Sequence, residues 1–140
     1  MEKITLPEGY KPSERETYMG PLQLEYFRKK LILWKEDLLG DSRETIKHLQ
    51  EDSHQEPDIY DRAVMESENS VELRTCDRYR KLIDKINSAL KRIENSEYGF
   101  CEETGEKIGI NRLDARPIAT MTIEAQERHE RYERQHSDEE

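Results

Sequence analysis

Apolar residues recur in alternating steps of three and four along two long, otherwise charged stretches of this chain. The first stretch runs from Pro21 to about His54, and the second runs from Pro57 to about Asn95. Such spacing places the apolar side chains on one stripe of an α-helix and implies a partner helix. Two stripes of matching length, joined by a reversal that contains proline, predict a long antiparallel coiled-coil hairpin. The stripe residues are Leu24, Phe27, Leu31, Trp34 and Leu38, followed by Cys76, Tyr79, Ile83, Ile86, Leu90 and Ile93.

Local signals mark where the first helix begins and how far it continues. Gly20 is an acceptable N-cap, Pro21 suits the first helical turn, and Gln23 occupies the N3 position of half a capping box. Gly40 interrupts the stripe, but Ile46 and Leu49 resume it, so we expect the helix to continue past a bend.

The reversal between the two helices, residues 56–63, carries two carboxylates. Pro57 ends the first helix because the residue before a proline disfavours the helical conformation. Asp58 fits the N-cap of the second helix and Asp61 its N3 position, near the positive end of the helix dipole. By spacing alone, both aspartates are sufficiently explained as capping residues.

The flanking segments are expected to form a small base for this arm. We divide the chain into an N-terminal segment (1–20) packing on the base, the arm (21–97) and a C-terminal base (98–140) with an acidic tail. The first segment is predicted to be irregular, with one short helix at 13–16, and with Tyr10 and Tyr18 packing against the base. The C-terminal part is predicted to contain two short strands within 99–108, a linker at 112–117 and a helix at about 122–134. Its expected core residues are Phe100, Ile108, Ile110, Leu113, Ile118 and Ile123.

Composition excludes several classes of function. Hydrophobic residues make up 33% of the chain and charged residues 39%, which suits a thin helical hairpin better than a compact globule. The formal net charge of −9 argues against sequence-independent binding of DNA, which needs a basic surface. No apolar run reaches membrane length and no signal-peptide core is present, so we expect a cytosolic protein with both cysteines reduced. No paired base and nucleophile, phosphate-binding glycine loop or metal cluster occurs, and we therefore expect a non-enzyme.

Three sequence segments resemble a known family. They are Pro57-Asp58-Ile59-Tyr60-Asp61-Arg62-Ala63, the run from Glu72 to Ile83, and Glu97-Tyr98-Gly99-Phe100-Cys101 together with Arg112-Leu113-Asp114-Ala115-Arg116-Pro117. In this order and spacing they resemble the DksA family of bacterial RNA polymerase-binding transcription factors, across about Tyr18 to Arg134. The resemblance implies a coiled-coil arm that enters the secondary channel of RNA polymerase. It also implies destabilised promoter complexes and, with (p)ppGpp, repression of ribosomal RNA promoters and activation of others, such as amino-acid biosynthesis promoters.

The resemblance also assigns roles to individual residues. Asp58, Asp61 and Ala63 match the tip that comes near the polymerase active site, and Arg78 matches an arm residue that contacts polymerase. The (p)ppGpp site, formed together with polymerase, corresponds to Leu82, Lys85, Arg116 and Gln126, where cations meet phosphates. Gln126 replaces the usual lysine, which puts the full alarmone affinity in question.

The base departs from the family pattern. The family prototype holds zinc with two Cys-x-x-Cys pairs, and the corresponding residues here are Cys101, Thr104, Thr122 and Ala125. One thiolate does not make a tetrahedral zinc site, so we expect a degenerate zinc finger without metal and a zinc-independent base. His129 and His136 lie elsewhere on the last helix. A redox role for the Cys101 thiol stays open, whereas Cys76 is most simply a small buried residue of the stripe.

Two other functions were weighed. A transcript-cleavage factor of the same channel also carries an acidic-tipped coiled coil, but its sequence motifs differ from those found here. A structural coiled-coil assembly protein would use the stripe as a dimer interface. The reversal at Pro57 instead favours a monomer in which the two helices of one chain pair with each other.

Overall fold

The computed structural model describes residues 4–52 and 59–137, and this part of the chain is mainly α-helical. Four helices follow one another: α1 (Pro21–Asp52), α2 (Ile59–Glu94), α3 (Ile110–Ala115) and α4 (Ile123–Ser137). The β-structure of the described residues is one isolated antiparallel bridge between Phe100 and Lys107. The mainly α fold class expected from the two stripes is confirmed.

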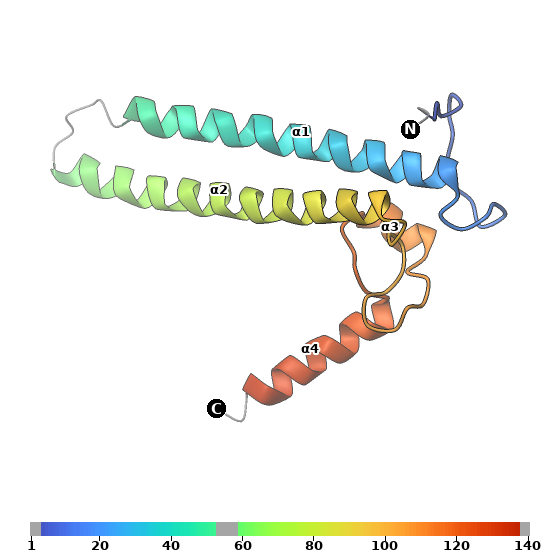
Figure 1. Cartoon of the computed structure of the whole chain (residues 1–140). Helices are drawn as coiled ribbons and strands as arrows, with labels where there is room; N and C mark the ends of the chain where they lie inside the picture. The colour runs from blue at the N-terminus through green and yellow to red at the C-terminus, as the bar shows by residue number, and fades with distance from the viewer. Residues whose placement is uncertain (1–3, 53–58, 138–140) are drawn as a thin grey trace. The chain divides into compact units, whose positions relative to one another are not determined.

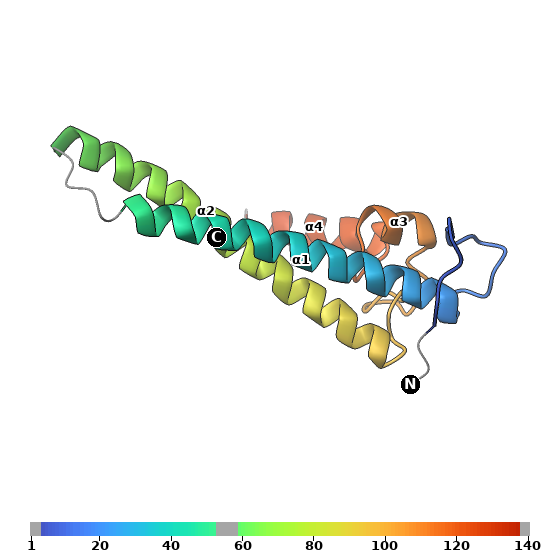
Figure 2. The same cartoon turned by 90° about the horizontal axis from the view of Figure 1, so that it is seen from above.

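The helices α1 and α2 lie side by side and run in opposite directions (Figures 1 and 2). They begin and end within a few residues of the positions that the sequence predicts. The apolar side chains that are buried on these two helices are Phe27, Leu31 and Leu38 of α1 and Ile86 and Ala89 of α2, and four of the five belong to the predicted stripes. Farther along the pair, His48 Nδ1 lies 3.1 Å from Glu72 Oε1. The continuation of the stripe is weaker than predicted, because Ile46 is 46% exposed.

The first turn of α1 is held by Gln23, as its N3 position predicted, but with a shift of one residue. The Met19 N–H donates a hydrogen bond of 2.8 Å to Gln23 Oε1, so the side chain reaches one residue beyond the expected N-cap. The amide Nε2 donates to the Ser13 carbonyl at 3.0 Å. Gln23 is 1% exposed, and it therefore connects the N-terminal segment to the helix from the interior.

The end of α2 directs the chain into the base. Ser96 adopts φ 59°, in the left-handed region that commonly follows a helix C-terminus. The N–H groups of Glu97 and Tyr98 both donate to the Arg92 carbonyl, at 2.8 and 3.2 Å. This turn places Tyr98 in the interior, where its side chain is 1% exposed and its hydroxyl donates to the Pro117 carbonyl at 2.7 Å.

Three local predictions for the flanking segments are wrong. Residues 13–16 form a turn instead of a helix. The two strands expected within 99–108 reduce to the single bridge already described, because glycines and turns interrupt the pairing. The expected linker at 112–117 is largely helical, since α3 spans Ile110–Ala115 and ends only at Arg116.

The base core agrees with the prediction at four of its six positions. Phe100 and Ile123 are wrong, because they are 40% and 51% exposed. The buried residues in this region include Tyr98, Cys101, Ile108, Ile110, Leu113, Ile118, Ala119, Thr122 and Ala125.

Two compact units divide the chain. One unit comprises residues 1–31 and 88–140, and the other comprises residues 32–87; we call them the base unit and the arm unit. Each helix of the α1–α2 pair contributes to both units. Among the described residues, no helix combines the length and the apolar character that crossing a membrane requires.

Candidate functional site

The tip residues are only partly described. Asp58 lies outside the described residues, as does the side chain of Asp61, so their predicted capping bonds stay predictions. Ala63 lies in the second turn of α2 and is exposed. A small exposed residue at this position lets another surface approach the helix backbone closely.

The candidate residues on the arm unit follow one another along α2. Arg78 and Lys85 are exposed, and Leu82 is half-buried. Leu82 lies four residues after Arg78 and three before Lys85, and such spacings place the three side chains on neighbouring parts of one helix surface. An exposed guanidinium and an exposed ammonium near an apolar side chain suit contact with an acidic partner or a phosphate group.

The other two candidates of the predicted alarmone site belong to the base unit. Arg116 directly follows α3 and is exposed, and its backbone N–H donates to the Arg112 carbonyl at 2.8 Å. Gln126 is half-buried in the first turns of α4 and donates from Nε2 to Glu130 Oε1 at 3.1 Å. Of the four residues predicted for the alarmone site, Leu82 and Lys85 therefore belong to the arm unit, and Arg116 and Gln126 belong to the base unit.

The four positions of the degenerate zinc finger come together in the base unit. Cys101 is 3% exposed, and its sulfur accepts hydrogen bonds from the Thr104 hydroxyl and from the backbone N–H groups of Thr122, Thr104 and Glu103. The Thr122 hydroxyl in turn accepts from the Ala125 N–H at 3.2 Å and caps the start of α4. Ala125 is fully buried beside it. Hydrogen bonds therefore connect positions that four thiolates would connect through a metal.

The surroundings of Cys101 favour the thiolate. Burial raises the pKa of the thiol, but the combined hydrogen bonds from Thr104 and from the backbone outweigh burial and lower the pKa from 9.0 to about 7. In a substantial fraction of the protein molecules, the Cys101 thiol is therefore ionised at neutral pH. This charge is stabilised by the N–H and O–H groups that donate to the sulfur.

The residues present do not fit a zinc ion. Tetrahedral zinc sites take four ligands from thiolate, imidazole and carboxylate groups. Here one thiolate meets two hydroxyls and a methyl group. Among the described residues, no group of three or more histidine, cysteine, aspartate or glutamate side chains is arranged to hold a metal ion.

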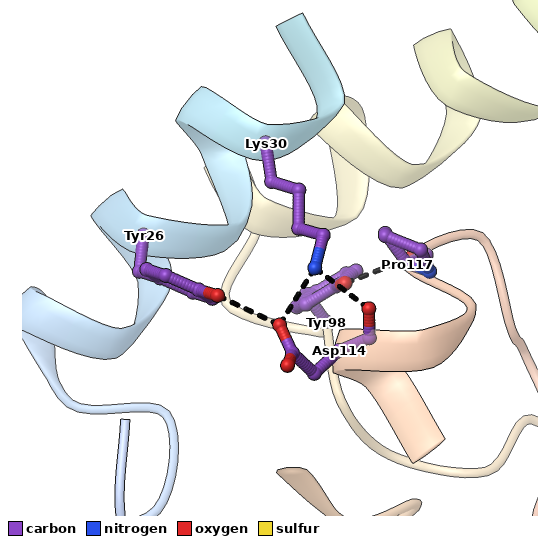
Figure 3. Close-up of polar contacts among 5 residues, drawn as sticks. All are labelled: Tyr26, Lys30, Tyr98, Asp114 and Pro117. Carbon is purple, nitrogen blue, oxygen red and sulfur yellow. Dashed lines mark hydrogen bonds and ion pairs between the residues drawn. The ribbon is translucent and has the colours of Figure 1, made fainter. Parts of the chain in front are cut away.

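A polar cluster joins α3 to α1 within the base unit (Figure 3). The sequence did not predict this cluster. The Lys30 ammonium donates to both the carbonyl and Oδ1 of Asp114, each at 2.7 Å. The Tyr26 hydroxyl donates to the same Oδ1 at 2.7 Å. Hydrogen bonds from Lys30 and from Tyr26 lower the pKa of Asp114. Tyr26 and Lys30 are four residues apart on a predicted helix, which is the only signal that the sequence offered.

Family models match both halves of the arrangement just described. Residues 23–93 match the DnaK suppressor protein DksA N-terminal domain, and residues 96–131 match the prokaryotic dksA/traR C4-type zinc finger. The chain is also 58% identical over 129 residues to the RNA polymerase-binding transcription factor DksA of Caulobacter vibrioides, which covers 92% of this chain and 91% of that protein. The chain belongs to the DksA family.

Other DksA family members agree with this assignment in sequence and in fold. The RNA polymerase-binding transcription factor DksA of Escherichia coli is 44% identical over 117 residues, covering 84% of this chain and 78% of that protein. Among solved structures, transcription factor DksA2 from Pseudomonas aeruginosa matches with a TM-score of 0.79 and 38% identity, covering 84% of this chain and 90% of that one. The match to a C4-type zinc finger stands beside a single remaining cysteine, and the base of this DksA family member thus keeps the segment but not the ligands.

Proposed function

We propose that this protein binds bacterial RNA polymerase through the secondary channel and regulates transcription at promoters. The observation that carries the proposal is the 58% identity, over nearly the whole chain, to a relative named for polymerase binding. The acidic net charge agrees with a regulator that acts through a protein partner and not through DNA. The arm (21–97) reaches into the enzyme and the base (98–140, with residues 1–20) supports it.

Within this proposal, the tip residues Asp58, Asp61 and Ala63 act near the polymerase active site, and Arg78 contacts polymerase from the arm. The protein destabilises promoter complexes, so it represses ribosomal RNA promoters and activates others, such as amino-acid biosynthesis promoters. It acts in the cytoplasm as a monomer and catalyses no reaction of its own.

Transcription in vitro from a ribosomal RNA promoter tests the role of the tip. Asp61→Asn removes one negative charge while keeping the side-chain shape, so we expect unchanged helicity and melting but a loss of promoter repression of tenfold or more. Asp37→Asn, an exposed position on α1, is the matched control and should repress like the wild type. Full repression by Asp61→Asn would overturn the tip assignment.

A transcript-cleavage assay tests the proposal that the protein catalyses no reaction. In backtracked transcription complexes, the wild-type protein should leave the rate of transcript cleavage unchanged. Accelerated cleavage that depends on Asp61 would instead favour a transcript-cleavage factor, and an obligate dimer in sedimentation would favour a structural coiled coil.

The alarmone site is proposed to form from Leu82 and Lys85 of the arm unit, Arg116 and Gln126 of the base unit, and polymerase. Lys85 and Arg116 supply the positive charge for the phosphates. We expect Gln126→Lys to add a third cation and to strengthen the (p)ppGpp-dependent part of repression several-fold, while repression without (p)ppGpp stays the same. Gln126→Met, which matches the length but adds no charge, is the control. An equal response of both variants would exclude Gln126 from the alarmone site.

The base is proposed to be independent of zinc. The support is chemical, because Thr104, Thr122 and Ala125 supply no thiolate and hydrogen bonds already satisfy the Cys101 sulfur. Elemental analysis of the purified protein should find less than a tenth of an equivalent of zinc, and chelators should leave its melting temperature unchanged. Stoichiometric zinc would refute this part of the proposal without affecting polymerase binding.

A further inference from the structure

The loop from Gly99 to Gly109 is closed by a tyrosine from a distant part of the chain. The Tyr18 hydroxyl donates a hydrogen bond of 2.6 Å to the Gly99 carbonyl. The same hydroxyl accepts one of 3.0 Å from the Gly109 N–H. Because Gly99 and Gly109 are the two ends of the loop, this side chain joins them, beside the backbone hydrogen bond of 2.9 Å from the Ile108 N–H to the Gly99 carbonyl. The Cys101 segment lies inside the loop that Tyr18 closes.

Tyr18 belongs to a segment that is itself firmly held. We call residues 10–20 the strap. The buried Gln23 side chain of α1 accepts from the Met19 N–H and donates to the Ser13 carbonyl, so two points of the strap are fixed to the first turn of α1. Met19 adopts φ 53°, a left-handed conformation that a methionine keeps only where its surroundings require it. The strap therefore presents Tyr18 to the loop in a defined position.

The contact between strap and loop is close on both limbs of the loop. A Cβ atom at Gly99 would lie 2.8 Å from Met19 Cγ and 3.2 Å from the Tyr18 hydroxyl, so the site requires glycine for the approach as well as for its φ of 92°. The Tyr18 ring meets Phe100 edge-on with centroids 5.6 Å apart. The Lys107 ammonium lies 5.2 Å from the centroid of the same ring. Phe100 and Lys107 are the two residues of the isolated bridge.

We propose that the strap, through Tyr18, positions the 99–109 loop in place of a metal ion. A zinc ion would hold this loop from the Cys101 side, by joining it to the start of α4. Here the hydrogen bonds around Cys101 are supplemented from the other side by a hydroxyl that joins both ends of the loop. Tyr18 is thus a positioning residue for the base, and the N-terminal segment is required for the base to be ordered. This inference rests on the zinc-independent base proposed above.

Amide hydrogen exchange in the full-length protein tests the role of Tyr18. Tyr18→Phe removes the hydroxyl but keeps the ring, and we expect exchange within residues 100–109 to accelerate at least tenfold, while exchange in α2 stays the same. Tyr132→Phe, an exposed position on α4, is the matched control and should leave the loop unchanged. Gly99→Ala, which would displace Met19 and Tyr18, should reproduce the effect of Tyr18→Phe. Unchanged loop exchange in Tyr18→Phe, or a uniform acceleration along the chain, would overturn the proposal.

A rebuilt metal site tests whether the strap and a metal act equivalently. In the triple variant Thr104→Cys, Thr122→Cys, Ala125→Cys, loaded with zinc and verified by elemental analysis, Tyr18→Phe should alter loop exchange less than twofold. An undiminished effect of Tyr18→Phe in the zinc-loaded protein would show that the two do not act equivalently. Finding stoichiometric zinc in the wild-type protein would instead contradict the zinc-independent base, and the exchange data on Tyr18→Phe would still report on the strap.

Discussion

At the scale of single residues, Cys101 is a buried thiol surrounded by hydrogen-bond donors. Hydrogen bonds from the Thr104 hydroxyl and from backbone N–H groups converge on its sulfur and lower its pKa to about 7 despite burial. These donors lower the free energy of the negatively charged form, which in a zinc site would be compensated by the cation. The protonation of one buried sulfur is therefore coupled to the folding of the base.

This coupling predicts that stability rises with pH through the neutral range. The pKa of Cys101 is about 7 in the folded protein and near its ordinary 9.0 in the unfolded chain, so the unfolded state binds more protons between these values. Stability then increases by up to about 1 kcal/mol per pH unit in this window, and the gain is lost as the pH falls through 7. Urea unfolding at pH 6.5, 7.5 and 8.5 under reducing conditions measures the slope.

Two variants separate Cys101 from the other titrating groups. Cys101→Ser replaces the thiol by a hydroxyl that does not ionise, and it should remove most of the pH dependence between 7 and 9. Cys76→Ser, at the half-buried cysteine of the arm unit, should lower stability without changing the slope. Equal slopes for the wild type and Cys101→Ser would show that the thiolate is not stabilised by the fold.

Much of the residue-level detail was accessible only from the structure. The sequence identified Gln23 from its position relative to Pro21 and named all four positions of the degenerate zinc finger by resemblance. It did not predict that Asp114 binds Lys30 and Tyr26, because residues so far apart in sequence are brought together only by the docking of α3. Nor did it predict the burial of Tyr98, whose position depends on the left-handed turn at Ser96.

At the scale of helices, the α1–α2 pair depends on a few fully buried side chains. Ile86 is completely buried, whereas Leu33 on α1 is 62% exposed although it is equally apolar. Removing buried methyl groups costs the transfer free energy and leaves a cavity, so Ile86→Ala should lower the free energy of unfolding by about 2–5 kcal/mol. Leu33→Ala should change it by no more than about 0.5 kcal/mol. Thermal melting followed by circular dichroism compares the two, and equal losses would contradict the predicted pairing face.

Long helices were predictable and short elements were not, for a physical reason. A stripe that repeats over several heptads gives α1 and α2 a strong signal, and their bounds fall within a few residues of the prediction. The helix α3 has only six residues, too few for a period, and its sequence contains the Arg112-Leu113-Asp114 run that was interpreted as a linker. Likewise, Phe100 and Lys107 form a single bridge, flanked by backbone hydrogen bonds from Cys101 to Glu106 and from Ile108 to Gly99, and this pairing is too short to give a strand pattern in the sequence.

At the scale of the whole molecule, α1 and α2 each contribute to two compact units. The core of the arm unit includes Leu38 and Ile86, and that of the base unit includes Phe27, Tyr98 and Leu113. Compact regions of one protein can open separately, and each then has its own free energy of opening.

Independent opening predicts that a core substitution affects exchange mainly in its own unit. Leu38→Ala should lower amide protection in the helical parts of residues 32–87 by roughly thirtyfold or more, since a loss of about 2 kcal/mol already has that effect. Protection at Ile108 and in α3 should change little. Leu113→Ala should do the reverse, because Leu113 is fully buried in the base unit. Hydrogen exchange followed by mass spectrometry of both full-length variants provides the comparison, and equal losses along the whole chain in each would mean that the two units unfold as one.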